Sequence, residues 1–415
     1  MARPGDDRDR LRQIFRDALI AVGGTTSVRL GLKQRSLDGP VTLIAVGKAA
    51  QAMSQGAFEV LGERISGGLI VTKPGHLHPG PLQERGLEAV VGGHPLPTEG
   101  SLQAGRRLIE LLQAGTGGSL LCLISGGASS LVEVPVAGLG LAELRRANQW
   151  LLGSGLPIEP VNLVRKALSA IKGGGLLRWV QKRRVRALAI SDVPGDRPDV
   201  IGSGLLVPEP ELQDRVRALA LPDWLSAWVT RGLQERTGLP REGPPLEIVA
   251  NLDRARKSAE QAARERGLPA VRHDAFIAGE AGARGRELAR ALIHGRTGVH
   301  VWGGETTVQL PPQPGRGGRN QHLALAAALE LAGHDDCLLL SAGTDGTDGP
   351  TEDAGALVDG GTMARALRQG LVAQDFLARA DAGTLLSATG DLIRTGPTGT
   401  NVMDLILGLK LGKSP

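Results

Sequence analysis

Residues 41–50, VTLIAVGKAA, combine an apolar run with a glycine and a lysine directly after it. The run from Val41 to Val46 is typical of a buried β-strand, and a helical pattern then extends to Leu61. The same order recurs at Ser119–Ile124, before a glycine-rich turn, and at Val185–Ile190, before the segment ISDVPGD. Strands that alternate with helices in this way predict an α/β fold with a parallel sheet that is covered on both faces.

The composition of the chain changes in its middle, between roughly residues 219 and 245, where four prolines interrupt it. Strand patterns then resume at Leu246–Ala250, Gly298–Trp302, Thr306–Leu310 and Cys337–Leu340, with helical patterns between them. A length of 415 residues suits two or three domains. We therefore predict two α/β domains, over residues 1–243 and 244–415.

The bulk properties argue against several classes of protein. The net charge is +5, but both signs are interspersed, and the 2% of aromatic residues leaves little for base stacking, so we expect no nucleic-acid partner. The two cysteines, Cys122 and Cys337, lie in apolar runs and have no zinc-site spacing. No apolar run approaches the ~20 residues that span a bilayer, and the N-terminus lacks an apolar leader. We expect a cytoplasmic protein that has no membrane partner.

The glycine-containing junctions after the strands are candidates for binding an anion. Ligands of parallel sheets bind beyond the carboxyl ends of the strands, where helix N-termini offer free N–H groups. Ser125, Gly126 and Gly127 suit a phosphate or carboxylate, although such junctions also occur as plain tight turns. Lys48 follows Gly47 at a helix start, where a lysine is unfavourable for the helix dipole. A phosphate-binding lysine is therefore a fair interpretation, and a solvated lysine is the alternative.

Two further segments carry charged residues in suggestive places. Asp192 follows an apolar strand and could act as a general base or a magnesium ligand, or simply bond its own turn. The glycine-rich turn GRGGRNQHLAL, residues 315–325, places Arg319 where a guanidinium could grip phosphate or carboxylate oxygens. Asn320 could instead satisfy helix-start donors, and Glu305 stands at the start of a strand pattern.

The stretch SAGTDGTDGPTEDAGALVDGG, residues 341–361, combines carboxylates with glycines after an apolar strand. Asp345 and Asp348 in such a loop suit a hard cation or a set of hydroxyl groups, and a solvated surface loop is the alternative. His76, His78 and His94 lie in loops rich in proline and glycine, without an acid cluster nearby in the sequence. We therefore predict no metal site at these histidines.

Taken together, the motifs resemble those of the MOFRL-type glycerate 2-kinases, also called class II glycerate kinases. The matching segments include VGKAA, GHPLPTEGS, LISGGASSL, ISDVPGDRPDVIGSG, GRGGRNQHLALA and GTDGTDGPTEDAGA, in family order between Val46 and Leu405. One departure is visible at Ser203-Gly204-Leu205-Leu206, where relatives often carry a proline after the glycine. This departure puts the local turn geometry in doubt, and not the chemistry.

The resemblance implies an enzyme that uses ATP and Mg²⁺ to phosphorylate D-glycerate at its 2-hydroxyl group. It also implies a Rossmann-like N-terminal domain, a distinct C-terminal α/β domain and an active site in the cleft between them; a homodimer is left open. The residues to which it assigns catalytic roles are Lys48, Asp192 and Arg319. We expect substrate or nucleotide binding by Gly47, Ser125, Gly126, Gly127, Ser129, Lys172, Glu305, Asn320, Asp345, Asp348 and Asn401, and metal binding by Asp192 and Asp345.

Two rival functions follow from other readings of the same residues. An NAD(P)H-dependent hydroxypyruvate reductase is a label that this family has sometimes carried, but the first strand is not followed by GxGxxG. A non-catalytic sensor of sugar acids would have little use for Lys48, Asp192 and Arg319 together. Consumption of ATP that depends on D-glycerate would exclude both rivals.

Overall fold

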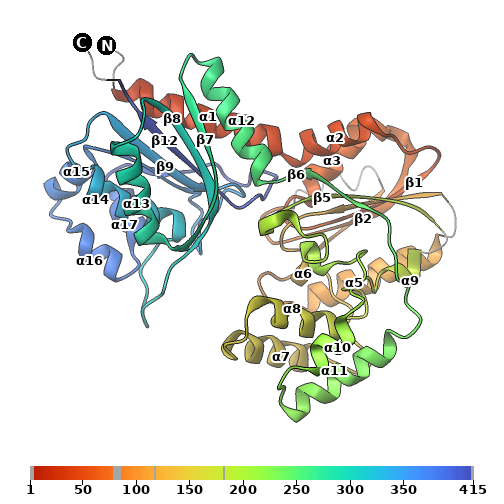
Figure 1. The fold of residues 1–415 in the computed structure, drawn as a ribbon. Coiled ribbons are helices and arrows are strands. Elements are labelled where there is room, and N and C mark those ends of the chain that lie inside the picture. Colours follow the sequence, from red (N-terminus) through yellow and green to blue (C-terminus); the bar gives the residue numbers. More distant parts are fainter. Residues whose placement is uncertain (1–3, 78–85, 116–117, 181–182, 413–415) are drawn as a thin grey trace. The chain divides into compact units, whose positions relative to one another are not determined.

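The chain divides into two compact units, which we describe from a computed structural model that covers residues 4–77, 86–115, 118–180 and 183–412. One unit comprises Gly23–Val249 and is called the central unit; the other comprises Met1–Val22 with Ala250–Pro415 and is called the terminal unit. Figure 1 shows the fold coloured along the sequence. These units differ from the predicted ranges 1–243 and 244–415 at both ends of the central unit.

The difference at the N-terminus arises from the packing of helix α1 (Pro4–Val22). Its apolar face, with Leu11, Ile14 and Phe15, is buried in a core of the terminal unit. The carboxylate of Asp17 lies 2.6 Å from the guanidinium of Arg266. The long-range burial of this amphipathic face therefore assigns helix α1 to the same unit as the C-terminal part of the chain.

The central unit is built from a sheet, helices on both of its faces and a helical extension. Its strands are β1 (Val41–Val46), β2 (Ile65–Thr72), β3 (Leu87–Val91), β4 (Ser119–Ile124), β5 (Arg184–Ile190) and β6 (Leu246–Ala250). Its helices are α2 (Gly24–Gln34), α3 (Ala50–Leu61), η1 (Gly62–Arg64), α5 (Glu99–Ala114), α6 (Ala128–Leu131), α7 (Leu141–Gly153), α8 (Ile158–Ala167), α9 (Leu177–Val180), η2 (Pro194–Asp196), η3 (Ile201–Ser203), α10 (Leu212–Arg217) and α11 (Asp223–Glu235).

The strand order in this sheet is β3-β2-β1-β4-β5-β6. Each pair from β3 to β5 is parallel, which confirms the predicted parallel α/β architecture. This order is that of the doubly wound sheets that bind nucleotides, and its direction reverses between β1 and β4. Because β6 joins this sheet, the predicted strand Leu246–Ala250 belongs to the first sheet and not to the second.

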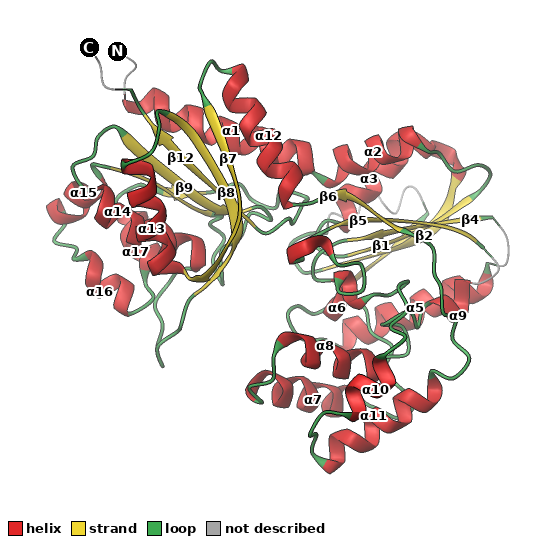
Figure 2. Cartoon of the chain, viewed as in Figure 1, coloured by secondary structure: helices red, strands yellow, loops and turns green. Residues whose placement is uncertain are grey.

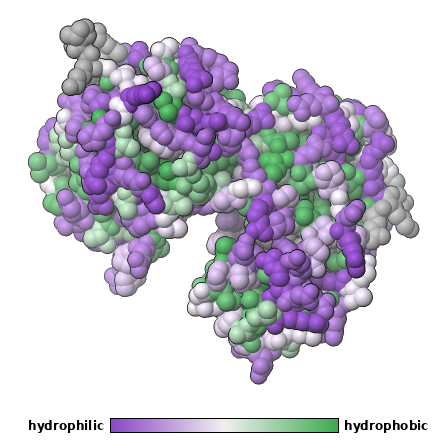
Figure 3. Space-filling view, viewed as in Figure 1, coloured by the Kyte–Doolittle hydropathy of each residue, from purple (hydrophilic) through white to green (hydrophobic). Residues whose placement is uncertain are grey.

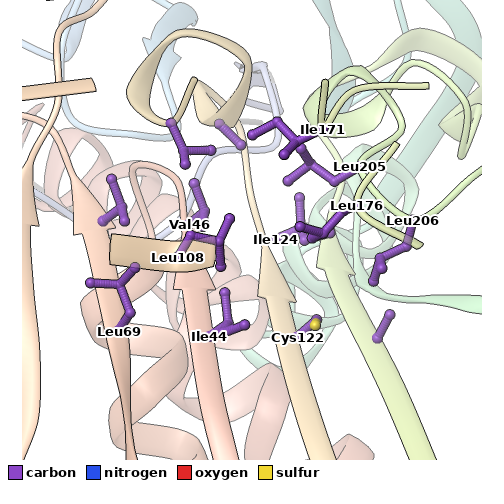
Figure 4. Packing of buried hydrophobic residues seen from close by; sticks show 14 of the residues in the cluster. Ile44, Val46, Leu69, Leu108, Cys122, Ile124, Ile171, Leu176, Leu205 and Leu206 are labelled. Carbon is purple, nitrogen blue, oxygen red and sulfur yellow. The ribbon is translucent and has the colours of Figure 1, made fainter. Parts of the chain in front are cut away.

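The sheet of the central unit carries apolar side chains from every inner strand. Figure 2 shows α2 and α3 on one face of the sheet and α5 and α6 on the other. Ile44, Val46, Cys122 and Ile124 pack against Leu108 of α5, and Ile171, Leu176, Leu205 and Leu206 close the same core near the strand ends (Figure 4). A separate apolar core joins α7, α8, α10 and α11. The packed core therefore holds the ends of the strands, and with them the loops that follow, in fixed positions.

The terminal unit contains a mixed sheet between two helical layers. Its strands are β7 (Ala270–Glu280), β8 (Gly298–Thr307), β9 (Cys337–Gly343), β10 (Gly355–Asp359), β11 (Leu392–Ile393) and β12 (Asp404–Lys410). Its remaining helices are α12 (Leu252–Glu265), α13 (Ala281–Ile293), α14 (Arg319–Leu331), α15 (Thr362–Arg368), α16 (Ala373–Ala378) and α17 (Ala382–Ala388).

The strand order of the second sheet is β11-β10-β9-β12-β8-β7, in which β7 and β8 are parallel and the other pairs are antiparallel. Alternate residues of β9 point to opposite faces, so Leu339 packs with α13 and α14 while Leu340 packs with α1 and α12. The inner strands β9 and β12 of this sheet are therefore buried on both faces. The predicted strand Thr306–Leu310 is wrong, because β8 already ends at Thr307.

Figure 3 shows hydrophilic side chains over most of the face in view. Within the described ranges, no helix combines the length and the apolarity that a bilayer crossing requires. Both cysteines are buried free thiols, and burial raises the pKa of the Cys122 thiol to about 12. The apolar runs that contain Cys122 and Cys337 are thus buried strands, an environment in which a thiol is unreactive.

Candidate functional site

The carboxyl ends of β1 and β4 meet at the point where the strand order reverses. In the parallel register Val46 pairs with Ile124, so the turn that begins at Gly47 faces the turn that begins at Ser125. Ligands of doubly wound sheets bind in the crevice at this switch point. The two junctions that the sequence singled out therefore lie side by side, at the place where this architecture receives a ligand.

Gly47 permits an unusually close approach of these two turns. Its φ is +132°, and a Cβ atom added there would lie 2.1 Å from Ser125 Oγ and 2.5 Å from the Ser125 carbonyl oxygen. The N–H of Lys48 donates to the Gly126 carbonyl at 2.9 Å, and the N–H of Ala49 donates to Ser125 Oγ at 3.1 Å. Only glycine fits at position 47, and backbone hydrogen bonds hold the two turns together.

Gly127 marks where two basic side chains pass over the second turn. Its φ is +84°, and a Cβ atom there would lie 3.4 Å from Lys48 Cγ and 3.1 Å from His94 Cδ2. Lys48 is half-buried at the start of α3, as the sequence predicted. The sequence placed His94 in a loop and gave it no binding role, although its position shortly after β3 could have indicated this edge of the sheet. His76 Nδ1 lies 3.2 Å from the Lys48 carbonyl oxygen, and His78 lies outside the described residues.

Asp192 lies at the same edge of the sheet. In the register of β4 and β5, Ile124 pairs with Ala189, so Ser191 and Asp192 follow the strand where Gly126 and Gly127 follow β4. Ser191 is fully buried and Asp192 is half-buried. The topology thus brings Lys48, the glycine turn and Asp192 to neighbouring strand ends.

The segment 202–204, which follows Asp192 in the chain, contacts the end of the glycine turn at Ser129. Ser203 Oγ donates to Ser129 Oγ at 2.7 Å. Gly202, Ser203 and Gly204 have φ values of +57°, +58° and +64°, which is a left-handed run at the segment where relatives often carry a proline. Gly202 and Gly204 can adopt this conformation at little cost, whereas Ser203 is strained. The predicted binding residue Ser129 is therefore held by a serine in a constrained turn.

Lys172 is held inside the central unit by a buried ion pair. Its ammonium group contacts Glu133, and both residues are almost fully buried. Ser169 Oγ donates to the second oxygen of the Glu133 carboxylate at 2.5 Å. The next residue, Gly173, donates its N–H to the Ser203 carbonyl at 2.9 Å. The described contacts of Lys172 thus fix the segment that supports the Ser203 turn.

In the terminal unit, Asp348 caps the N-terminus of α14. Its Oδ1 accepts from the Asn320 N–H at 3.0 Å and its Oδ2 accepts from the Gln321 N–H at 2.8 Å. Burial raises the pKa of Asp348, the two N–H donors oppose this, Asp404 raises the pKa further and Arg319 lowers it, so that it lies at about 6. Both carboxylate oxygens of Asp348 therefore accept hydrogen bonds from the first turn of α14. Burial of the ionised carboxylate destabilises the folded protein.

Arg319, the first residue of α14, stands among carboxylates. Its Nε and Nη2 donate to Asp404 at 2.6 Å and 2.9 Å, and its Nη1 lies 3.1 Å from Glu305 Oε1. Burial lowers the pKa of Arg319, but the bonds and charges of these partners outweigh it, so the pKa is raised. Arg319 also lines a cavity of about 320 Å³ with Thr306, Gly318 and other residues. The sequence predicted Arg319 and Glu305 but missed Asp404.

The other predicted residues of the terminal unit have structural partners nearby. Asn320 is buried and its Oδ1 accepts from Ser341 Oγ at 2.7 Å. Asp345 is 7% exposed, and its Oδ1 accepts from the N–H and the hydroxyl of Thr347 at 3.0 Å and 2.9 Å. Asn401 is buried just before β12. The acidic stretch therefore belongs to the α14 site and is not a solvated loop.

Comparison with known proteins places the whole chain in one family. Residues 10–228 match a domain of unknown function, DUF4147, and residues 298–404 match the MOFRL family. A D-glycerate 2-kinase of Thermotoga maritima is 38% identical over 408 residues, which cover 96% of this chain and 97% of that protein. A protein of Agrobacterium vitis that bears the name of a hydroxypyruvate reductase is 35% identical and covers 96% of this chain and 93% of its own length.

A solved structure supports the same relationship. The crystal structure of a glycerate kinase from Thermotoga maritima superposes with a TM-score of 0.87 at 36% identity, and the match covers 98% of this chain and all of that one. The motifs that suggested the resemblance thus stand in a chain of the same architecture, over nearly its entire length. The chain belongs to the MOFRL-type glycerate 2-kinase family.

Proposed function

We propose that this protein transfers the γ-phosphoryl group of ATP to the 2-hydroxyl group of D-glycerate, giving 2-phosphoglycerate and ADP. The observation that carries the proposal is the position of Lys48 against Gly127 at the β1–β4 switch point. It is joined by the full-length likeness to a protein named D-glycerate 2-kinase. A lysine and a glycine turn at this point suit a phosphate group.

The chemistry asks the protein for positioning and charge neutralisation more than for covalent participation. The bond between the 2-hydroxyl oxygen and the γ-phosphorus forms while the bond from that phosphorus to the β,γ-bridging oxygen breaks. Asp192 is proposed to accept the hydroxyl proton. Lys48 and Arg319 are proposed to hold phosphoryl or carboxylate oxygens, with N–H groups of the Ser125–Gly127 turn as further donors. That these groups meet in one active site stays a prediction, as does a homodimer.

Mg²⁺ is part of the proposal, and the residues present fit it. Among the described residues, no group of three or more His, Cys, Asp or Glu side chains could hold a metal ion by itself. Mg²⁺ usually needs only one or two carboxylates when substrate phosphates complete its shell. Asp345, whose Oδ1 accepts from the N–H and the hydroxyl of Thr347, is the proposed carboxylate, and Asp192 keeps the role of the base. When bound, the ion would neutralise charge on the phosphate oxygens.

The strand order of the central unit is also compatible with a hydroxypyruvate reductase, because doubly wound sheets of this order bind dinucleotides. Its fingerprint requires a second and a third glycine after β1, to admit a pyrophosphate and to pack the helix against the sheet. Here Gly47 is followed by Lys48 and two alanines, and both the Lys48 and Ala49 N–H groups bond to the neighbouring turn. The first turn thus favours a phosphate beside a lysine over a dinucleotide.

The test is a coupled assay for ADP with D-glycerate, combined with NMR of the product to separate 2-phosphoglycerate from 3-phosphoglycerate. We expect turnover that depends on both substrates, and no oxidation of NADH or NADPH with hydroxypyruvate. Asp192→Asn should lower kcat by about 10²- to 10⁴-fold. Lys48→Ala should lower kcat/KM by about 10²- to 10³-fold. The exposed residues Asp214 and Lys33 give matched controls, as Asp214→Asn and Lys33→Ala. Near-normal turnover of a site variant would remove that residue from the mechanism.

A further inference from the structure

Arg319 makes two ion pairs that differ in their surroundings. Asp404 accepts from Nε and Nη2, and only 3% of the Asp404 side chain is exposed. Glu305 faces Nη1 at 3.1 Å, and 42% of the Glu305 side chain is exposed. The guanidinium therefore has one edge fixed by a buried carboxylate and one nitrogen whose partner reaches solvent.

The two pairs should differ in how readily an external anion replaces them. A planar guanidinium binds a carboxylate most strongly through two parallel hydrogen bonds, which is the geometry of the Asp404 pair. Exposed ion pairs such as that with Glu305 contribute little, because water and salt compete with them. An incoming anionic oxygen can therefore displace Glu305 from Nη1, while Asp404 stays in place.

The position of Arg319 makes such an exchange useful. Arg319 lines the cavity of about 320 Å³ together with Thr306, Gly318 and His322. His322 Nδ1 is buried and has no hydrogen-bond partner among the described residues. The cavity adjoins the N-terminus of α14, where the Asp348 carboxylate already accepts from the first N–H groups. The guanidinium of Arg319 is therefore the group in this cavity that favours an anionic ligand.

We propose that Asp404 is a positioning residue for Arg319, and that Glu305 is an internal counterion which an anionic oxygen of the substrate displaces. The oxygen belongs to the carboxylate of glycerate or to a phosphate of the nucleotide, since both present the same chemistry to Nη1. This inference rests on the proposed kinase function. It changes the predicted role of Glu305 from a ligand-binding group to a competitor of the ligand.

Glu305→Gln tests the competition, because the amide keeps the size of the side chain and loses its charge. Binding is measured by calorimetry with D-glycerate, with ADP and with inorganic phosphate in separate titrations, alongside steady-state kinetics. We expect Kd and KM for one substrate to fall about two- to fivefold, as the loss of an exposed ion pair implies, with kcat within about twofold. The substrate that responds identifies the anionic group that meets Arg319.

Glu330→Gln is the matched control, since Glu330 lies on α14 and also pairs with an arginine, Arg290 of α13. It should leave both KM values unchanged. Unchanged affinities in Glu305→Gln, or weaker binding, would overturn the counterion role, and a large fall in kcat would place Glu305 in the chemistry. If the wild-type protein binds these ligands without turnover, the kinase function fails, while the titrations still report on the competition.

The positioning role of Asp404 is tested with Asp404→Asn and Asp404→Glu. A misplaced Arg319 should raise KM for the responding substrate by about 10- to 100-fold, and the glutamate should restore part of the loss. Thermal unfolding checks that the variants are folded. A folded Asp404→Asn protein with wild-type affinity would rule out positioning; if that variant does not fold, Asp404→Glu and the Glu305→Gln titrations decide.

Discussion

At the β1–β4 junction, backbone hydrogen bonds and close packing fix the two turns. Gly47 packs against Ser125, and the Lys48 side chain passes close to Gly127. At the start of α14 the positions of the groups depend on charge, with Asp348 on the helix N-terminus and Arg319 between Asp404 and Glu305. Close packing is sensitive to a change in side-chain volume and insensitive to pH and salt. Ion pairs are sensitive to both pH and salt. The two regions should therefore lose stability or activity under different perturbations.

The largest effect is expected from Gly47→Ala. The added methyl group would overlap Ser125 Oγ at 2.1 Å and the Ser125 carbonyl at 2.5 Å, at a φ of +132°. We expect a loss of about 3–6 kcal/mol in the free energy of unfolding, from overpacking and backbone strain together, and no measurable turnover. Urea denaturation and the ADP assay measure the two outcomes.

Gly39→Ala is the control for this prediction. Gly39 also has a positive φ, +70°, but a Cβ atom there meets nothing within 4 Å. It should cost about 1 kcal/mol, from strain alone, with activity retained. Equal losses in the two variants would show that the close approach to Ser125 has no special importance.

The second prediction concerns the buried ion pair of Lys172 and Glu133, and it tests whether the stability of the central unit also depends on charge. Lys172 and Glu133 are 3% and 2% exposed, so Lys172→Met leaves a buried carboxylate without its cation. We expect a loss of about 3–5 kcal/mol in the free energy of unfolding. The double variant Lys172→Met/Glu133→Gln should recover much of it. A loss below about 1 kcal/mol in the single variant would confine charge dependence to the terminal unit.

The third prediction concerns pH and Asp348, whose neighbours Arg319 and Asp404 carry charges of opposite sign. Its pKa is raised from the ordinary 3.8 to about 6. Between these values the folded chain holds a proton that the unfolded chain has released, so stability falls as pH rises from about 4 to 6 and is then level. The difference of about two units corresponds to about 3 kcal/mol.

The measurement is the free energy of unfolding of the wild-type protein and of Asp348→Asn between pH 3.5 and pH 7.5, by urea titration. The two curves should converge or cross on this slope, because asparagine does not titrate. Parallel curves would refute the raised pKa. The asparagine variant should also lose one hydrogen bond to α14, since its amide nitrogen cannot accept from an N–H.

The smallest effect is expected from Ser203→Ala. It removes the 2.7 Å hydrogen bond to Ser129 at a buried turn, which should cost about 1 kcal/mol. Ser129→Ala should cost a similar amount, and the double variant little more than either single one, because the two hydroxyls share one bond. Fully additive losses in this cycle would mean that the two serines do not act together.

Much of the fold could be predicted because buried strands appear in the sequence as runs of apolar residues. Val41–Val46 and Ser119–Ile124 consist almost entirely of apolar residues, and the structure places both inside the first sheet. Strands β7 and β10 were missed for opposite reasons. The segment of β7, AVRHDAFIAGE, is largely exposed and shows no alternation, and β10 lies within the acidic, glycine-rich stretch that suggested a loop.

The candidate site was predictable only where sequence neighbours act together. Lys48 and the Ser125–Gly127 turn follow strands directly, so their position at a sheet edge could be inferred. Asp404 lies 85 residues from Arg319, and only the pairing of β12 with β8 and β9 brings the two together. Likewise, the inward turn of Asp348 toward α14 depends on tertiary structure that no local pattern reports.

The chain order of the two units has a consequence for synthesis on the ribosome. Helix α1 ends at Val22 and its partner α12 begins at Leu252, with the whole central unit encoded between them. At ~5–20 residues per second, the nascent α1 waits on the order of 10–50 s for that partner. During this interval the apolar face with Leu11, Ile14 and Phe15 has no native cover, while the central unit can already fold. The middle of the polypeptide is thus the part that can mature first, whereas helix α1 gains its native cover only after the later strands and α12 have been synthesised.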